Sequence, residues 1–151
     1  MNHWLLKSEP TCYSIDDLAR DGVTPWDGIR NYQARNFMRD DMRVGDEVFF
    51  YHSNTKPPHI AGIGRIASTP YPDPTQFDAQ SEYYDPKATV EKPRWFLVDV
   101  AFVAKAKEPL SLPVIKNDPS LSEMLVIQKG QRLSIQPVSK KHFEYIKAII
   151  V

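Results

Sequence analysis

RWFLVDVAFVAK, residues 94–105, carries the most regular apolar pattern of the chain. Apolar side chains recur at every second position, at Phe96, Val98, Val100 and Phe102. A repeat of two residues places these side chains on one face of an extended chain, which is typical of a β-strand with a buried face. We therefore predict a strand over residues 95–104.

Four further segments, on both sides of this one, have the composition of strands. They are residues 3–8, 46–52, 60–67 and 131–137. Gly62 and Gly64 fall on the same face of the third segment, and two glycines so placed indicate that a bulky group packs against bare backbone. The proline- and tyrosine-rich segment 68–93 is expected to form a long loop, and a loop of that length inside a domain is usually functional.

The same patterns predict several helices. Ser14, Ser111 and Ser139 each precede a helical pattern as an N-cap does, and Gly22 supplies a stop for the first helix. Another helix is expected over residues 32–42. Strands and helices do not alternate regularly, so a doubly wound parallel sheet is not expected. We predict an α+β fold, a mixed β-barrel of five to six strands with peripheral helices.

The composition limits the classes of function. The chain has 151 residues, which fits a single domain over 1–151, and its 19 basic side chains balance 19 acidic ones. A protein that coats nucleic acid by charge alone is usually strongly basic, so only a local basic rim is compatible with this balance. The apolar run before Lys7 is too short for a signal peptide or a membrane span. We expect a cytoplasmic protein that does not bind membranes.

The patterns typical of enzymes are missing. No glycine-rich phosphate loop is present, because Gly62 and Gly64 lie within a predicted strand that no helix follows. The four histidines show no metal-ligand spacing, and no histidine and asparagine pattern supports Cys12 as a nucleophile, so we expect Cys12 to be a small buried residue. We predict no catalytic residues, no metal site and no cofactor.

Trp26 is placed unusually, in the turn between Pro25 and Asp27-Gly28 within TPWDGIRNYQARNFMR, residues 24–39. A side chain in a turn is available to stack on a flat ring, although a tryptophan there also suits a lid over the core. A pocket for a base would also need polar side chains that hydrogen-bond to the edge of the base, aromatic side chains from the long loop, and cationic side chains that bind phosphates. Our candidates are Ser8 and Asn31 for the edge, Tyr83 or Tyr84 to close the pocket, and Arg30, Arg35, Lys129 and Arg132 for phosphates.

Several of these segments together resemble the EVE domain family. The motifs run in order over nearly the whole chain. They are WLLKSEP (4–10), YSIDDL (13–18), TPWDGIRNYQARNFMR (24–39), GDEVFFYHSN (45–54), YYDPKA (83–88), PRWFLVDVAF (93–102) and KGQRLSIQPV (129–138). The resemblance implies a pseudo-barrel of the PUA-like superfamily that is similar to the YTH domain, a reader of methylated adenine in RNA.

The resemblance also implies a function. EVE domains bind modified bases, notably modified cytosines in DNA, so the expected partner is DNA or RNA carrying a modified base. Lys7-Ser8 resembles the Lys-Ser that follows the first strand of YTH domains, so Lys7 joins Ser8 and Asn31 as an expected contact to the edge of the base. Trp26 resembles the stacking tryptophan of YTH domains. The other cage aromatics have no counterpart at fixed spacing, so Tyr83 and Tyr84 remain candidates from the loop alone.

Two other functions stay open beside a non-enzymatic reader. One is an enzyme or accessory factor acting on RNA or nucleotides, and the other is a module that binds a small molecule or protein in the same cleft. The eukaryotic members carry an extended basic tail that is missing from this sequence, so we expect a bacterial protein. Whether a nuclease or modification system works beside it stays open as well.

Overall fold

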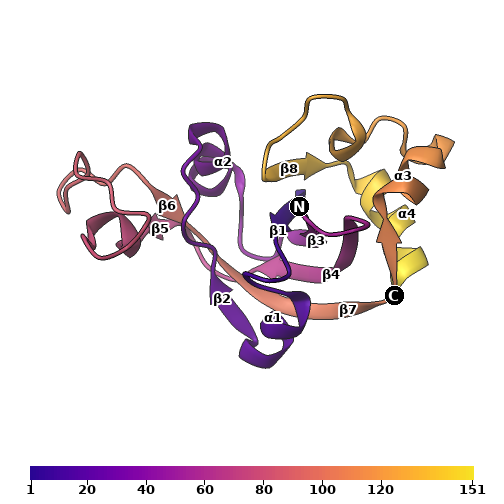
Figure 1. The fold of residues 1–151 in the computed structure, drawn as a ribbon, viewed down its shortest axis with the longest axis horizontal. Coiled ribbons are helices and arrows are strands. Elements are labelled where there is room, and N and C mark those ends of the chain that lie inside the picture. Colours follow the sequence, from indigo (N-terminus) through magenta and orange to yellow (C-terminus); the bar gives the residue numbers. More distant parts are fainter.

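The strand β7 (Asp99–Ser111) is the longest strand of a six-stranded mixed sheet (Figure 1). The computed structural model describes residues 1–151. The other strands of this sheet are β1 (His3–Ser8), β2 (Val23–Pro25), β3 (Glu47–His52), β4 (His59–Ile66) and β8 (Ile135–Val138). The order is β2-β7-β4-β3-β1-β8, with β1 and β3 parallel and the other neighbours antiparallel. Because β2 and β8 do not pair, the sheet is a half-barrel, and the predicted mixed sheet with outer helices is confirmed.

The central strands are apolar on both faces, because each face has its own core. In β3, Val48 and Phe50 belong to one buried cluster, whereas Phe49 and Tyr51 belong to the other. A strand buried on both faces shows a continuous apolar run in place of alternation. The first cluster extends to Trp26, and the second is covered by the C-terminal helix through Phe143 and its neighbours.

The helices lie outside the sheet, as expected. They are α1 (Ile15–Asp21), α2 (Tyr32–Asn36), a π-helical turn η1 (Phe37–Asp41), α3 (Leu112–Asn117) and α4 (Lys140–Ile150), with short 3-10 turns η3 (Pro119–Leu121) and η4 (Leu125–Ile127). Ser14 is the predicted N-cap of α1 and forms a capping box with Asp17, and Ser139 caps α4. None of the helices combines the length and apolarity that a membrane crossing requires.

The segment 68–93 is more ordered than the loop we predicted. It contains the strand β5 (Tyr71–Pro72) and the 3-10 turn η2 (Pro74–Phe77), and β5 pairs with β6 (Phe96–Leu97) in a small second sheet at one end of the molecule (Figure 1). The Gln76 side chain, which is fully buried, donates to the Asp73 and Trp95 carbonyl groups at 2.8 and 2.7 Å. These hydrogen bonds hold η2 against Trp95, the residue that precedes β6.

Gly62 confirms that a bulky group packs on bare backbone. A Cβ atom at this position would lie 2.6 Å from the Ala104 carbonyl oxygen and 2.7 Å from Cδ1 of Ile15, which anchors α1 on the sheet. Both distances are shorter than a Cβ atom can have to a neighbouring atom, and the backbone oxygen of Ala104 cannot move without distorting the sheet. We therefore expect Gly62→Ala to lower the free energy of unfolding by about 1–3 kcal/mol, measured by urea denaturation. The matched variant Gly130→Ala, where no atom is near but φ is +79°, should lose only about 1 kcal/mol. Equal losses in the two variants would contradict the packing argument.

Candidate nucleic-acid interface

A cavity of about 350 Å³ opens beside the turn that holds Trp26. It lies between the end of β1, the turn that connects β1 to α1, the end of β2 with the turn after it, and the segment that carries Tyr83. Its lining residues are Lys7, Ser8, Cys12, Tyr13, Thr24, Pro25, Trp26, Asp27, Gly28, Ile29 and Tyr83. Four of the ten predicted site residues, Lys7, Ser8, Trp26 and Tyr83, thus border one cavity although they come from three distant segments.

Trp26 belongs to both the core and the cavity. Its side chain is 8% exposed and meets the Phe50 ring edge-on, at 5.5 Å between ring centroids and 88° between planes. Its indole N–H group has no hydrogen-bond partner in the protein, and the buried polar atoms include none without a partner. Solvent therefore reaches the indole nitrogen, and Trp26 is one of the residues that line the cavity. Trp26 thus packs against Phe50 in the core and also lines the cavity.

The Tyr83 ring lies directly on the backbone of Gly28. A Cβ atom at Gly28 would approach the ring carbons to 2.7–3.0 Å, and the residue has φ of +78°. Both facts require glycine at this position. The Arg30 guanidinium group lies 5.5 Å from the centre of the Tyr83 ring and donates twice to the Tyr83 carbonyl oxygen, at 3.1 and 2.8 Å. Arg30 thus holds Tyr83 in place over the turn.

Asp73 joins the Trp26 turn to the segment that carries Tyr83. Its carboxylate is 1% exposed and accepts hydrogen bonds from the backbone N–H of Gly28 at 2.8 Å, from Arg30 at 3.1 Å, and from both the N–H and the hydroxyl group of Thr75. Burial by itself raises the pKa of Asp73, but these hydrogen bonds outweigh it and hold the pKa below its ordinary value. Asp73 is therefore charged at neutral pH and fixes the rim of the cavity.

The end of β1 presents two different side chains. Ser8 donates its hydroxyl hydrogen to the Tyr13 carbonyl oxygen at 2.7 Å, so its oxygen remains free to accept. Successive side chains of a strand point to opposite faces, and the Lys7 ammonium group lies 5.9 Å from the Tyr51 ring, on the face opposite Ser8. Burial lowers the pKa of Lys7. Lys7 therefore borders the cavity at its margin. Cys12 is exposed, contrary to our prediction that it would be buried, because it lies in the turn after β1.

Asp27 is the polar side chain of the cavity that sequence reasoning missed. Its carboxyl group has no ion pair and no hydrogen bond to another residue within the protein. The residue is exposed, yet the cavity walls partly desolvate the carboxyl group and raise its pKa, and the charge of Asp73 raises it further. We had interpreted Asp27-Gly28 only as a turn signal. Its position directly after Trp26 was the clue that the carboxyl group faces the same space.

The other predicted site residues lie outside the cavity lining. We expected Asn31 to face the cavity, but it does not line it. Its side-chain oxygen accepts a hydrogen bond from the Ala34 N–H at 3.0 Å and caps α2. Tyr84 is 43% exposed, and Lys129 and Arg132 are exposed on the loop before β8.

The two predicted phosphate-binding arginines near the turn also differ from expectation. Arg30 is engaged by protein oxygen atoms. Arg35 donates to the Arg94 carbonyl oxygen at 2.8 Å and lies over the Tyr32 ring. Both guanidinium groups therefore hold the second sheet against the Trp26 turn.

The whole chain matches a known family. The model of the EVE domain matches residues 2–149. This chain belongs to the EVE domain family. Human thymocyte nuclear protein 1 is 41% identical to this EVE domain over 166 residues, which cover 98% of the chain and 73% of the human protein.

Solved structures of other proteins have the same fold as this EVE domain. A protein of Pseudomonas putida superposes with a TM-score of 0.92 at 51% identity, covering 97% of this chain and 98% of the other. The human THYN1 protein, in complex with DNA that contains 5-methylcytosine, superposes with a TM-score of 0.89 at 41% identity, covering 98% and 96% of the two chains. The fold of a relative whose structure holds DNA containing 5-methylcytosine is thus retained over nearly all of this EVE domain.

Proposed function

We propose that this EVE domain is a reader that takes a modified cytosine of DNA into the cavity beside Trp26. The observation that carries the proposal is that one cavity is lined by the aromatic residues Trp26 and Tyr83 and by the unpaired carboxyl group of Asp27. The human relative in complex with DNA containing 5-methylcytosine supports the same ligand class. The cavity volume of about 350 Å³ also lies at the lower end of the range of small-ligand sites, about 300–1,000 Å³.

The polar groups of the cavity suit the edge of cytosine. The exocyclic amino group of cytosine donates hydrogen bonds, and a carboxylate is its usual protein acceptor. Asp27 supplies that acceptor, and the indole N–H supplies a donor for a ring nitrogen or carbonyl oxygen. Pro25, Ile29 and the ring of Trp26 provide apolar surface that a 5-methyl group can contact. A base that enters this cavity must leave the stack of a duplex or come from a single strand.

The same contacts favour binding over catalysis. The Ser8 hydroxyl group, at the end of β1, donates its hydrogen bond to the Tyr13 carbonyl oxygen. No histidine lines the cavity. A nucleophile needs a base within hydrogen-bond distance, and neither Ser8 nor Cys12 of the lining makes a hydrogen bond to the Asp27 carboxyl group.

Asp27→Asn is the first test of the edge contact. The amide keeps the size of the side chain but replaces one acceptor oxygen by a donor, which faces the amino group of cytosine unfavourably. We expect the affinity for an oligonucleotide with a single 5-methylcytosine to fall about tenfold. Fluorescence anisotropy at one fixed salt concentration measures it.

The charge change needs its own control. Asp16→Asn removes one negative charge from an exposed residue outside the cavity and should leave the affinity unchanged or slightly raised. If Asp27→Asn binds as tightly as the unchanged chain, Asp27 does not read the edge. Oligonucleotides with cytosine, 5-methylcytosine or 6-methyladenine, each as DNA and as RNA, then decide the ligand. Preference for an RNA base or no preference among them would refute the proposal.

A further inference from the structure

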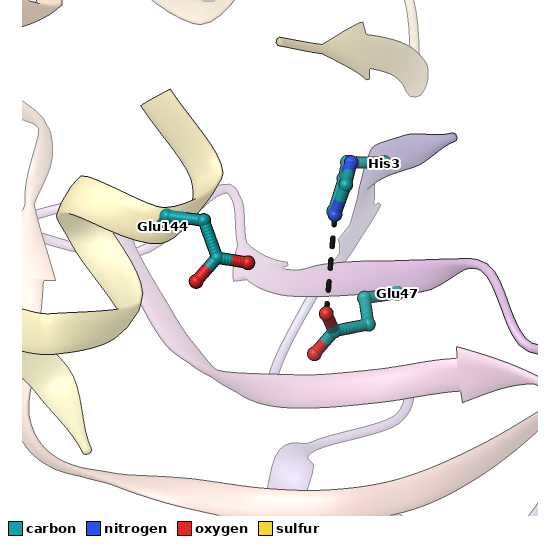
Figure 2. Close-up of side chains that lie close together, drawn as sticks. All are labelled: His3, Glu47 and Glu144. Atoms are coloured by element: carbon teal, nitrogen blue, oxygen red, sulfur yellow. Dashed lines mark ion pairs between the residues drawn. The ribbon is translucent and has the colours of Figure 1, made fainter. Parts of the chain in front are cut away.

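A second cluster of side chains lies far from the Trp26 cavity, where α4 crosses the first residues of β1 and β3. His3 and Glu47 are paired neighbours in the register of these two parallel strands, and Glu144 reaches them from α4 (Figure 2). One potential ligand atom from each of the three residues lies within 4.8 Å of the other two. The base cavity lies at the opposite end of β1, so this cluster has no part in the proposed function.

His3 is a buried side chain without a hydrogen bond. It is 5% exposed, and its Nε2 atom lies 3.9 Å from Oε1 of Glu47, which is beyond hydrogen-bond distance. The Phe143 ring, 4.7 Å away between centroids, holds the imidazole from one side. No fully enclosed polar atom of the protein lacks a partner, so the His3 nitrogens, which make no hydrogen bond, are reached by solvent, and the nitrogen near Glu47 is available to bind an additional partner.

Lys147 supplies the positive charge of the cluster. Its ammonium group lies 2.9 Å from Oε2 of Glu47, and its side chain is 37% exposed. An ion pair of this exposure contributes little to stability. The lysine can therefore turn out to solvent when another cation takes its place, and Glu144, which is exposed, is free to rotate inward.

We propose that His3, Glu47 and Glu144 bind a divalent transition-metal ion of the zinc type. Imidazole nitrogen together with carboxylate oxygen suits zinc and its neighbours in the first row, whereas magnesium prefers oxygen ligands alone. Zinc binds its ligands at about 2.0–2.2 Å, so tetrahedral ligand atoms lie about 3.4 Å apart. The cluster reaches this spacing by a movement of about 1 Å, small for an exposed glutamate. Three protein ligands leave a fourth position for water.

The site was not predicted, and we expected no metal. The sequence offered only four scattered histidines without metal-ligand spacing. The three ligands come from the first strand, the third strand and the last helix, so only the fold brings them together.

Zinc titration of the full chain, after treatment with a chelator, tests the site. Isothermal titration calorimetry should show one strong site for Zn²⁺ and none for Mg²⁺. Glu144→Gln removes a ligand that makes no hydrogen bond in the protein, so the variant should fold normally and bind zinc at least about tenfold more weakly. Lys147→Met removes the competing ammonium group and should bind zinc more tightly. Cys12→Ser, at the distant exposed cysteine, should leave the zinc affinity unchanged.

Nuclear magnetic resonance locates the ion. With ¹⁵N-labelled histidine, zinc should move the ring signals of His3 and leave those of His52, His59 and His142 in place. No zinc binding, an unchanged affinity in Glu144→Gln, or zinc binding that leaves the His3 signals unmoved would each overturn the proposal. An affinity that does not rise in Lys147→Met would contradict the placement of the ion against Glu47.

Discussion

Replacing Trp26 by leucine is expected to weaken binding of an oligonucleotide with one 5-methylcytosine by about five- to a hundredfold. Stacking of a base on an aromatic side chain contributes about 1–3 kcal/mol, and leucine offers no ring for it. The indole N–H is lost as well. Leucine still supplies apolar volume toward Phe50, which the edge of Trp26 contacts in the core. Fluorescence anisotropy titration measures the affinity, and base stacking on Trp26 should also quench its emission.

Leucine is a better replacement than alanine, because Trp26 is also a core residue. Truncating a buried tryptophan to alanine costs about 3–5 kcal/mol of stability, so a loss of binding in Trp26→Ala would be confused with unfolding. Trp4→Leu is the matched control. Trp4 is 3% exposed, belongs to the same buried cluster and does not line the cavity. It should lose stability without losing affinity.

One result of the comparison between the two leucine variants would contradict the stacking role of Trp26. If Trp26→Leu melts as a folded protein and binds the oligonucleotide with the affinity of the unchanged chain, the ring of Trp26 does not stack on the base. Trp26 would then serve only as the lid over the core that its contact with Phe50 already shows.

Local patterns predicted the elements of this fold well. The Ser14 N-cap, the strand at β3 and the packing at Gly62 are properties of a few consecutive residues or of one face of a strand, and the structure has all three. The strand predicted over 95–104 is divided at Val98, where the chain passes from β6 in the small sheet to β7 in the large one. That division depends on a partner strand, β5, which no local pattern identifies.

The site was predicted less completely, because a polar residue type suits several roles. Asparagine suits both an edge contact and a helix N-cap, and Asn31 caps α2. Arginine suits both a phosphate and a buried carboxylate, and Arg30 pairs with Asp73, which lies 43 positions away in the chain. The tertiary fold decides between such roles. The place of Trp26 in a turn, unusual for so large an apolar side chain, indicated that it lies at the surface of a cavity, and the structure has it in the cavity lining.

The pair of Arg30 and Asp73 carries the second large expected effect. Arg30→Ala leaves the Asp73 carboxylate, which is 1% exposed, without its cationic partner. Breaking a buried ion pair by removing one partner costs about 3–5 kcal/mol. We expect about 3 kcal/mol, the lower end, because the Arg30 side chain is 22% exposed and water can enter there. Urea denaturation at pH 7 measures the loss, and Arg39→Ala is the control, since Arg39 pairs only with exposed Asp40 and should change stability by less than about 0.5 kcal/mol.

The pH dependence distinguishes this ion pair from a loss of packing around Arg30. The pKa of Asp73 is lowered in the folded chain, so the stability that its charge contributes is complete above the unfolded value of about 3.9 and is lost as the pH falls through the lower folded value. The difference between the unchanged chain and Arg30→Ala should therefore shrink on acidification below about pH 4. Lost contacts of the Arg30 side chain with the Tyr83 and Trp95 rings would remain at every pH. A difference of the same size at pH 3 and pH 7 would assign the stabilisation to those contacts and not to the charge of Asp73.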